Sequence, residues 1–170
     1  MEDGSMGIAA NPELKNLLKS TKLKEIMGTD VIKVSVDDPF SKVEELFINH
    51  GITHVMVVDY TNKLVGLISQ KYVYKTQSPR KYIDEEMTPE RDTLVDGDSY
   101  YRKEILDSYI LTNTMQKDPL TLSPDDSVVK AVTLMAQRKL GCIPLVDKTH
   151  KICGLVTTHE IVKFIAQLLK

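Results

Sequence analysis

Apolar and polar positions follow strand-like and helix-like spacings along the chain, and the same order of segments occurs twice. The first set begins with a strand at 31–36 and a helix from Phe40, in which apolar residues recur every three or four positions. Two apolar strands follow at 55–58 and 64–68. The second set repeats this order, with its strands and last helix at 120–123, 143–146, 152–156 and 161–169. Each set therefore predicts the order β-α-β-β-α.

A direct repeat accounts for this double order. Residues 27–75 match residues 115–163 without a gap, at the constant offset of 88 positions that separates Met27 from Met115. Identical pairs include Asp59 with Asp147 and Gly66 with Gly154. One copy has too few strands to bury its apolar face alone, so we expect the two copies to pack together.

The repeat and the segments around it predict the domain organisation. We expect an α+β fold, with small sheets covered by helices in an α/β sandwich-like arrangement. The predicted parts are an N-terminal tail with a short helix, a first repeat, a polar connector and a second repeat, at 1–20, 21–76, 77–104 and 105–170. A connector of this length is either functional or mobile. It leads into an amphipathic helix predicted at 100–111, which packs across the repeats or docks a partner chain.

Turn and cap residues predict where the first long helix begins and ends. Asp38 suits the N-cap and Pro39 the first helical position. Gly51 stands where a left-handed C-terminal cap is expected. Asn11 is predicted to cap the short N-terminal helix in the same way as Asp38 caps the longer one.

Composition and charge argue against nucleic-acid binding and against a membrane-spanning helix. The 22 Lys and Arg against 24 Asp and Glu give a net charge of −2, and aromatic residues are 6%, which argues against nucleic acid as a partner. No apolar run approaches the roughly 20 residues of a membrane helix. The start of the chain lacks a secretory pattern, so we expect a cytoplasmic location.

A hairpin turn predicted at 147–150 places Cys142 opposite Leu155 and disfavours a disulfide with Cys153.

The motifs resemble a known family. Both copies contain, in order, Met-x-x-Asp, Asp-Asp, Val-Asp and Gly-Leu-x-[Ser/Thr], as in a tandem pair of cystathionine-β-synthase (CBS) domains, a Bateman module. The resemblance implies two copies packed around a pseudo-twofold axis, with clefts between them that bind adenosine nucleotides. It also implies a homodimer of modules that reports to a separate effector protein.

The resemblance further implies the ligand-binding residues. The family signature Gly-x-x-[Ser/Thr]-x-x-Asp falls on Thr157 and Glu160 in the second copy, where helix N-terminal amides suit a phosphate and the carboxylate suits ribose. In the first copy Ser69 matches, but Tyr72 replaces the acid. We therefore expect one competent site, around the second copy. By family position the adenine contacts there are Pro119, Leu120, Ile143 and Pro144. A phosphate also needs a cation, for which the candidates are His159, Arg138, Lys139 and, from the other copy, Lys71 or His54.

The same residues allow a purely structural interpretation. Thr157 and Glu160 form Thr-x-x-Glu before an apolar run, which is the pattern of a capping box that stabilises a helix without any ligand. The chain has no phosphate-binding glycine loop, catalytic triad order or metal-ligand spacing, so we expect no enzyme activity, no metal and no required cofactor.

Two hypotheses follow. The first is a regulatory sensor of an adenosine nucleotide, with AMP first and ADP, ATP, S-adenosylmethionine, NAD or a cyclic dinucleotide as further candidates. The second is an oligomerisation module with empty clefts that acts through protein partners. The missing acid at Tyr72 and the capping pattern support the second.

Overall fold

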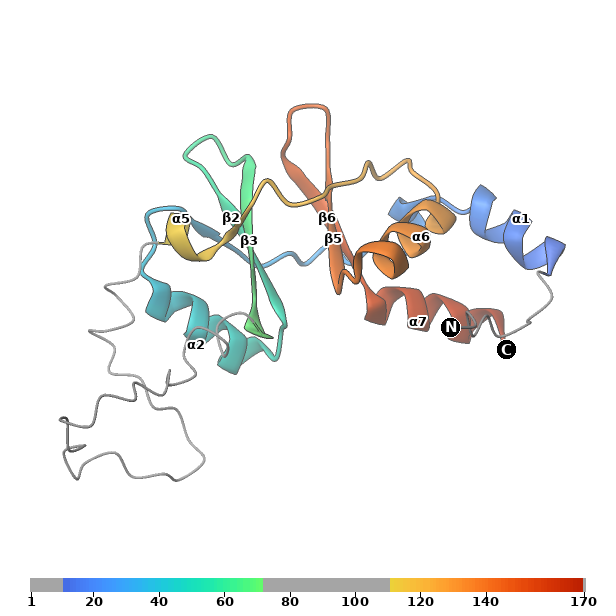
Figure 1. The fold of residues 1–170 in the computed structure, drawn as a ribbon, viewed down its shortest axis with the longest axis horizontal. Coiled ribbons are helices and arrows are strands. Elements are labelled where there is room, and N and C mark those ends of the chain that lie inside the picture. The colour runs from blue at the N-terminus through green and yellow to red at the C-terminus, as the bar shows by residue number, and fades with distance from the viewer. Residues whose placement is uncertain (1–10, 72–110, 170) are drawn as a thin grey trace, which may run out of the picture. The chain divides into compact units, whose positions relative to one another are not determined.

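The computed structural model describes residues 11–71 and 111–169, which group into two compact units. One unit combines the described parts of 1–31 and 119–170, and the other consists of the described parts of 32–118. The predicted connector at 77–104 and the helix predicted at 100–111, apart from Leu111, lie outside the described residues. Both units contain helices and paired strands (Figure 1), which confirms the predicted α+β class.

The unit of residues 32–118 is built on a sheet with strand order β1-β2-β3-β4. Strands β1 and β2 are parallel, and the other neighbours are antiparallel. Helix α2 packs against β2, and the core lies between the helix and the sheet. The described elements are β1 (Lys33–Ser35), α2 (Phe40–His50), β2 (His54–Val58), β3 (Leu64–Ser69), α5 (Leu111–Thr114) and β4 (Gln116–Lys117).

The second unit repeats this plan with fewer regular strands. Strands β5 and β6 form an antiparallel hairpin, and single bridges join Leu122 to Leu145 and Gly28 to Leu155 where the other unit has β1 and β4. The strand predicted at 120–123 is therefore reduced to one bridge. The elements are α1 (Pro12–Ser20), the 3-10 turn η1 (Leu23–Glu25), α6 (Val128–Arg138), β5 (Cys142–Val146), β6 (Ile152–Thr157) and α7 (Thr158–Leu168).

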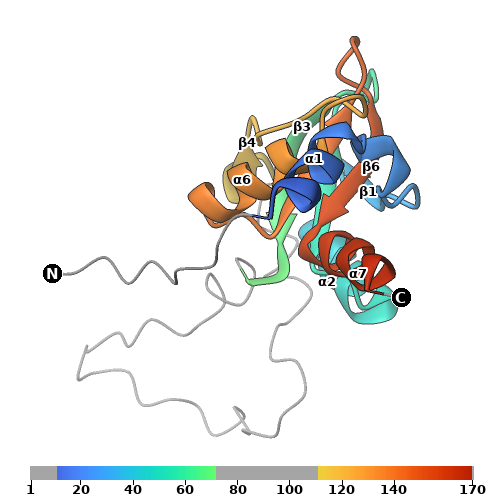
Figure 2. The same cartoon turned by 90° about the vertical axis from the view of Figure 1, so that its right-hand side faces the viewer.

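Each unit takes its leading segment, the stretch before the first strand of a repeat, from the other repeat. The leading segments are the described residues 11–31, which belong to the unit of β5 and β6, and 111–118, which belong to the unit 32–118. Leu23 lies at the start of the first repeat, yet its side chain is fully buried in the core formed by α6, β5 and β6. Leu111 holds the corresponding position at the start of the second repeat and is buried in the core of the unit 32–118. Helix α1 follows the same rule, because it lies along α6 in Figures 1 and 2 and contacts it. The unit of β5 and β6 is thus made of two separate parts of the chain, whereas the unit 32–118 is one continuous range that includes the start of the second repeat.

Helix ends agree in part with the predicted caps. Asn11 caps α1 through its side-chain oxygen, and Gly51 ends α2 with a left-handed φ of 59°, as predicted. The N-cap of α2 is Pro39, so the prediction of Asp38 was wrong by one residue. The Asp38 carboxylate accepts instead from the backbone N–H of Ser35 at 2.7 Å, and it pairs with Lys42 at 2.9 Å. Those two contacts fix the turn before the helix.

The repeat offers a test of the left-handed cap. Lys139 stands where the first repeat has Gly51, and it ends α6 with φ 54°. A side chain in this conformation is strained, and glycine is not. Lys139→Gly is therefore expected to raise the free energy of unfolding by about 0.5–1 kcal/mol, measured by urea denaturation. Gly51→Ala is the matched control with the opposite sign. A lower stability for Lys139→Gly would contradict the argument.

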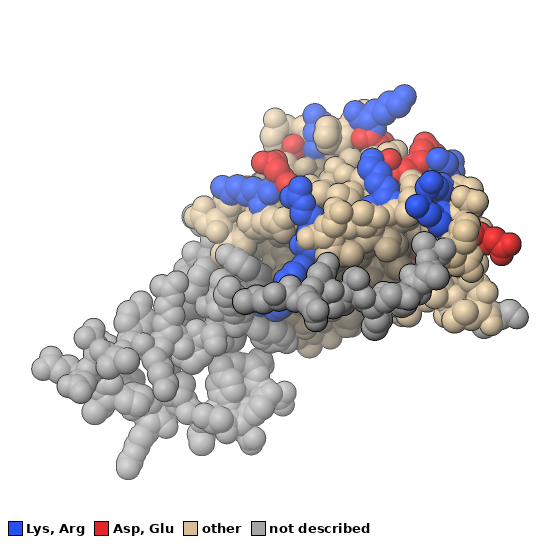
Figure 3. Space-filling view, turned by 45° about the vertical axis from the view of Figure 1, so that its right-hand side comes forward, with Lys and Arg blue, Asp and Glu red and all other residues tan. Residues whose placement is uncertain are grey.

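The surface carries mixed charge. On the face drawn in Figure 3, basic and acidic side chains lie among one another instead of separating by sign. Exposed ion pairs such as Lys24 with Asp125 at 2.8 Å are part of this pattern. On this face, the described residues form no basic stripe of the kind that nucleic-acid binding uses. No helix among the described residues is both long enough and apolar enough to cross a membrane.

Candidate functional site

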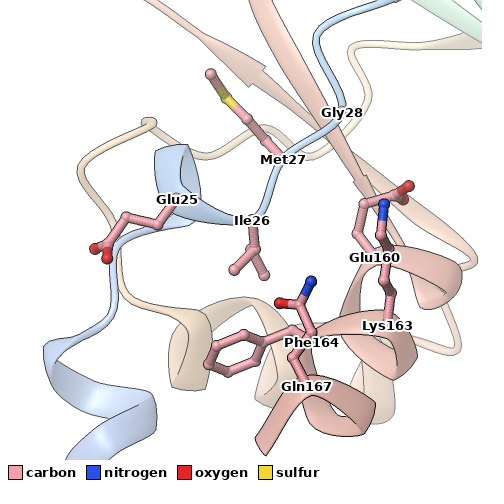
Figure 4. A pocket seen from close by; sticks show the side chains of 8 residues that line it. All are labelled: Glu25, Ile26, Met27, Gly28, Glu160, Lys163, Phe164 and Gln167. Carbon is pink, nitrogen blue, oxygen red and sulfur yellow. The ribbon is translucent and has the colours of Figure 1, made fainter.

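A pocket of about 220 Å³ opens in the unit that contains β5, β6 and α7. Its wall is formed on one side by the segment 25–28, at the start of the first repeat, and on the other side by the last helix of the second repeat (Figure 4). The lining residues are Glu25, Ile26, Met27, Gly28, Glu160, Lys163, Phe164 and Gln167.

Backbone pairing holds the leading segment against the strand that enters α7. The Gly28 N–H donates to the Leu155 carbonyl, and the Gly28 carbonyl accepts from the Leu155 N–H, both at 2.9 Å. Met27 turns away from the pocket toward Gly154, while Ile26 and Phe164 lie on the core side (Figure 4). These two half-buried side chains give the pocket an apolar wall.

Glu160 takes part in the predicted capping box. One carboxylate oxygen, Oε2, accepts from the Thr157 N–H at 3.0 Å and from the Thr157 hydroxyl. The Thr157 hydroxyl oxygen in turn accepts from the His159 N–H at 3.1 Å. The capping box expected from Thr-x-x-Glu is therefore present, and its bonds use only Oε2 of the two carboxylate oxygens.

The second oxygen of Glu160 lies beside the leading segment. Oε1 is 3.9 Å from the place that a Cβ at Gly28 would take, and Figure 4 shows the carboxylate at the same end of the pocket as Gly28 and the Lys163 amine. Glu160 and Gly28 both line the pocket, and no hydrogen bond within the described residues uses Oε1. A hydroxyl group of a ligand fits such an acceptor.

Lys163 and Gln167 add a cation and an amide. They follow Glu160 by three and seven positions, so the three side chains share one face of α7, and Figure 4 shows the Lys163 amine near the end of the pocket where Glu160 lies. Among the described residues, no ion pair or hydrogen bond involves the Lys163 amine. Sequence analysis missed both residues, although their helical spacing from Glu160 was available as a signal.

The residues predicted to bind a ligand are only partly brought together. Of these residues, Glu160 alone lines the pocket. Thr157 and His159 lie at the start of α7, next to it in sequence. Ser69 ends β3 and belongs to the unit 32–118. The predicted adenine contacts, buried or half-buried in the same unit as the pocket, are Pro119, Leu120, Ile143 and Pro144.

The cysteines are free thiols in the hairpin. Cys142 pairs with Thr157, so the predicted register opposite Leu155 was wrong by two positions. The turn takes one residue more than predicted, and a bulge at Leu145 and Val146 takes another. Burial raises the pKa of the Cys142 thiol to about 12, which keeps it protonated and unreactive. No group of acidic, His or Cys side chains suited to a metal ion occurs at residues 11–71 or 111–169.

Comparison with known proteins identifies the repeated unit. The family model for the CBS domain matches residues 23–78 and again residues 108–167. Homoserine O-acetyltransferase of Methanohalobium evestigatum is 24% identical over 157 residues, which cover 92% of this chain and 27% of that protein. Inosine-5′-monophosphate dehydrogenase of Korarchaeum cryptofilum is 26% identical over 150 residues, 88% of this chain and 25% of that protein. The chain thus spans about a quarter of the length of these curated relatives.

Solved structures share the fold. A CBS domain-containing protein of Bacillus anthracis has a TM-score of 0.69 at 19% identity, covering 90% of this chain and 98% of that chain. CBSX2 in complex with AMP has a TM-score of 0.66 at 18% identity, covering 89% and 100%. The CBS domain pair of protein MJ0100, in complex with 5′-methylthioadenosine and S-adenosyl-L-methionine, has a TM-score of 0.66 at 19% identity, covering 86% and 97%. With both repeats matched by the family model, the chain belongs to the CBS domain family, as a tandem pair of CBS domains.

Proposed function

We propose that this chain is a regulatory module that binds an adenosine-containing ligand and catalyses no reaction itself, with AMP as the first ligand to test. The observation that carries the proposal is the pocket at Glu160, in which a carboxylate, an ammonium and an amide stand beside an apolar wall. Adenosine is common to the ligands of CBSX2 and MJ0100. It combines a flat base with ribose hydroxyls, and the pocket offers partners for both.

The contacts divide between the base and the sugar. Oε1 of Glu160 is the acceptor that the cap leaves open, and it suits the ribose hydroxyls. Ile26 and Phe164 supply apolar surface for the base, and a base that stacks on an aromatic ring gains about 1–3 kcal/mol. The ligand would lie between the leading segment of the first repeat and the last helix of the second. Its binding would therefore stabilise the attachment of that segment.

The output of such a module depends on a partner. Several apolar side chains of α7 are exposed, with Val162 at 63% and Ile165 at 43%. A helix with apolar residues on its exposed side is suited to contact with another chain. We include in the proposal a homodimer, a separate effector protein and a cytoplasmic location.

Thermal unfolding tests ligand binding directly. AMP at about 100 times its dissociation constant is expected to add roughly 2.7 kcal/mol to the free energy of unfolding. At about 2–4 °C per kcal/mol for a chain of this size, Tm should rise by roughly 5–11 °C. ADP, ATP, NAD and S-adenosylmethionine form the comparison panel. In Glu160→Gln the rise produced by AMP is expected to shrink, because the carboxylate that receives the ribose hydroxyls is lost.

Glu160→Gln is the informative variant because it separates the two roles of this residue. Gln also occurs at this position of capping boxes, so the helix start is retained while the charge is removed. Glu160→Ala is the matched variant that removes both roles. Each variant is compared with its own ligand-free Tm. If all five ligands leave the Tm of the wild-type chain unchanged, the sensor proposal is wrong.

A second candidate function is an oligomerisation module without a ligand. The capping box favours it, because Thr157 and the helix start explain Glu160 without any bound molecule. This candidate predicts that analytical ultracentrifugation gives the same assembly with and without nucleotide. A ligand-dependent change in assembly would contradict it.

A further inference from the structure

Lys163 is the cationic side chain of the pocket, and the proposed function leaves it without a role. We propose that Lys163, supported by Gln167, selects adenosine ligands that carry an anionic phosphate over ligands with a neutral or cationic tail. The inference rests on the proposed function and specifies what the same site distinguishes. The specificity-determining group is the Lys163 ammonium.

The positions of the polar groups on α7 support this division of roles. Glu160 and Lys163 are three residues apart, so their Cβ atoms are about 5–6 Å apart on one helix face. A nucleoside monophosphate presents hydroxyls on one edge of the ribose and a phosphate on the other. The hydroxyls suit the acceptor oxygen of Glu160, and the phosphate suits the ammonium one turn later. Gln167 continues the same face by one further turn and adds amide donors.

The electrostatic surroundings leave the ammonium available. In the described part of the chain, no carboxylate lies within ion-pair distance of the Lys163 amine. The other carboxylate of the pocket belongs to Glu25, which accepts the Lys22 N–H at 2.7 Å. Figure 4 shows the Glu25 side chain directed away from Lys163. Since Lys163 has no ion pair there, its ammonium attracts an incoming phosphate and repels a sulfonium or ammonium tail, against the opposite effect of the Glu160 carboxylate at the same end of the pocket.

Isothermal calorimetry with AMP and adenosine as paired probes tests the inference. The wild-type chain is expected to bind AMP about tenfold more tightly than adenosine, which is the effect of one charge-assisted contact. Lys163→Gln removes the charge and keeps the stem, so the ratio of the two affinities should fall to within about twofold of one. Lys148→Gln is the matched control, because Lys148 is exposed in the hairpin turn of the same unit and lies outside the pocket. It should leave the ratio unchanged.

The outcomes separate this inference from the proposed function. If adenosine and AMP bind but Lys163→Gln keeps the wild-type ratio, the role of Lys163 is wrong and the sensor function stands. If neither probe binds the wild-type chain, the proposed function fails and the inference fails with it. S-adenosylmethionine, which carries a cationic tail, tests whether the effect depends on the sign of the ligand charge. Lys163→Gln should bind it at least as tightly as the wild-type chain does. A loss of S-adenosylmethionine affinity equal to the loss for AMP would indicate that Lys163 shapes the pocket without reading charge.

Discussion

Gly154→Ala is expected to lower the free energy of unfolding by about 2–3 kcal/mol, because the methyl group has no room. A Cβ at this position would lie 2.5 Å from the Met27 sulfur and 3.0 Å from the Gly28 carbonyl oxygen. Gly154 is a point on β6 where Met27 and Gly28 approach closely. The substitution should therefore loosen the segment that forms one wall of the pocket. Urea denaturation with a fitted midpoint and slope measures the loss.

The other repeat provides the matched experiment. A Cβ at Gly66 would lie 2.1 Å from the sulfur of Met115 and 2.8 Å from its Cγ, with no backbone atom among its nearest neighbours. A substitution can remove the Met115 side chain but not the Gly28 carbonyl. Met115→Ala should therefore restore the stability lost in Gly66→Ala more fully than Met27→Ala restores the stability lost in Gly154→Ala. Double-mutant cycles report this as coupling energies of about 1–2 kcal/mol. Additive effects at both pairs would contradict the close approach.

Local sequence patterns predicted most of the elements. The four hairpin strands lie within one residue of the positions read from apolar runs, and the repeat predicted that the two copies share one plan. The final helix begins at Thr158, three residues earlier than the apolar stripe indicated. The extra turn at 158–160 consists of polar residues, so the spacing of apolar residues does not reveal it.

Local sequence patterns did not predict that each unit takes its leading segment from the other repeat. A single buried leucine at 23 or 111 has no periodicity, and the sequence around it does not indicate which repeat supplies its core. Lys163 escaped prediction for a related reason. Its helix face becomes part of a pocket only because Gly28 pairs with Leu155 and brings the segment 25–28 against α7. Glu160 was found because its role is encoded locally, by the spacing from Thr157.

Leu23→Ala is expected to destabilise the unit of β5 and β6 by about 2–5 kcal/mol, the cost of a cavity at a fully buried leucine. Its side chain is 0% exposed, and its neighbours come from α6 and the hairpin of the second repeat. Native-state hydrogen exchange locates the effect, because local opening is reported segment by segment. Amides at 142–157 should exchange faster, and amides at 54–69 should change less.

Leu111→Ala should produce the opposite pattern of hydrogen exchange. Leu111 is 1% exposed in the core of the unit 32–118, so its loss should raise exchange at 54–69 more than at 142–157. Leu14→Ala is the control for a leucine of the leading segment that is 44% exposed, and its effect should stay within about 0.5 kcal/mol. If Leu23→Ala raised exchange mainly at 54–69, the leading segment would serve its own repeat. The pocket at Glu160 would then lose one of its walls, so this measurement also bears on the ligand site.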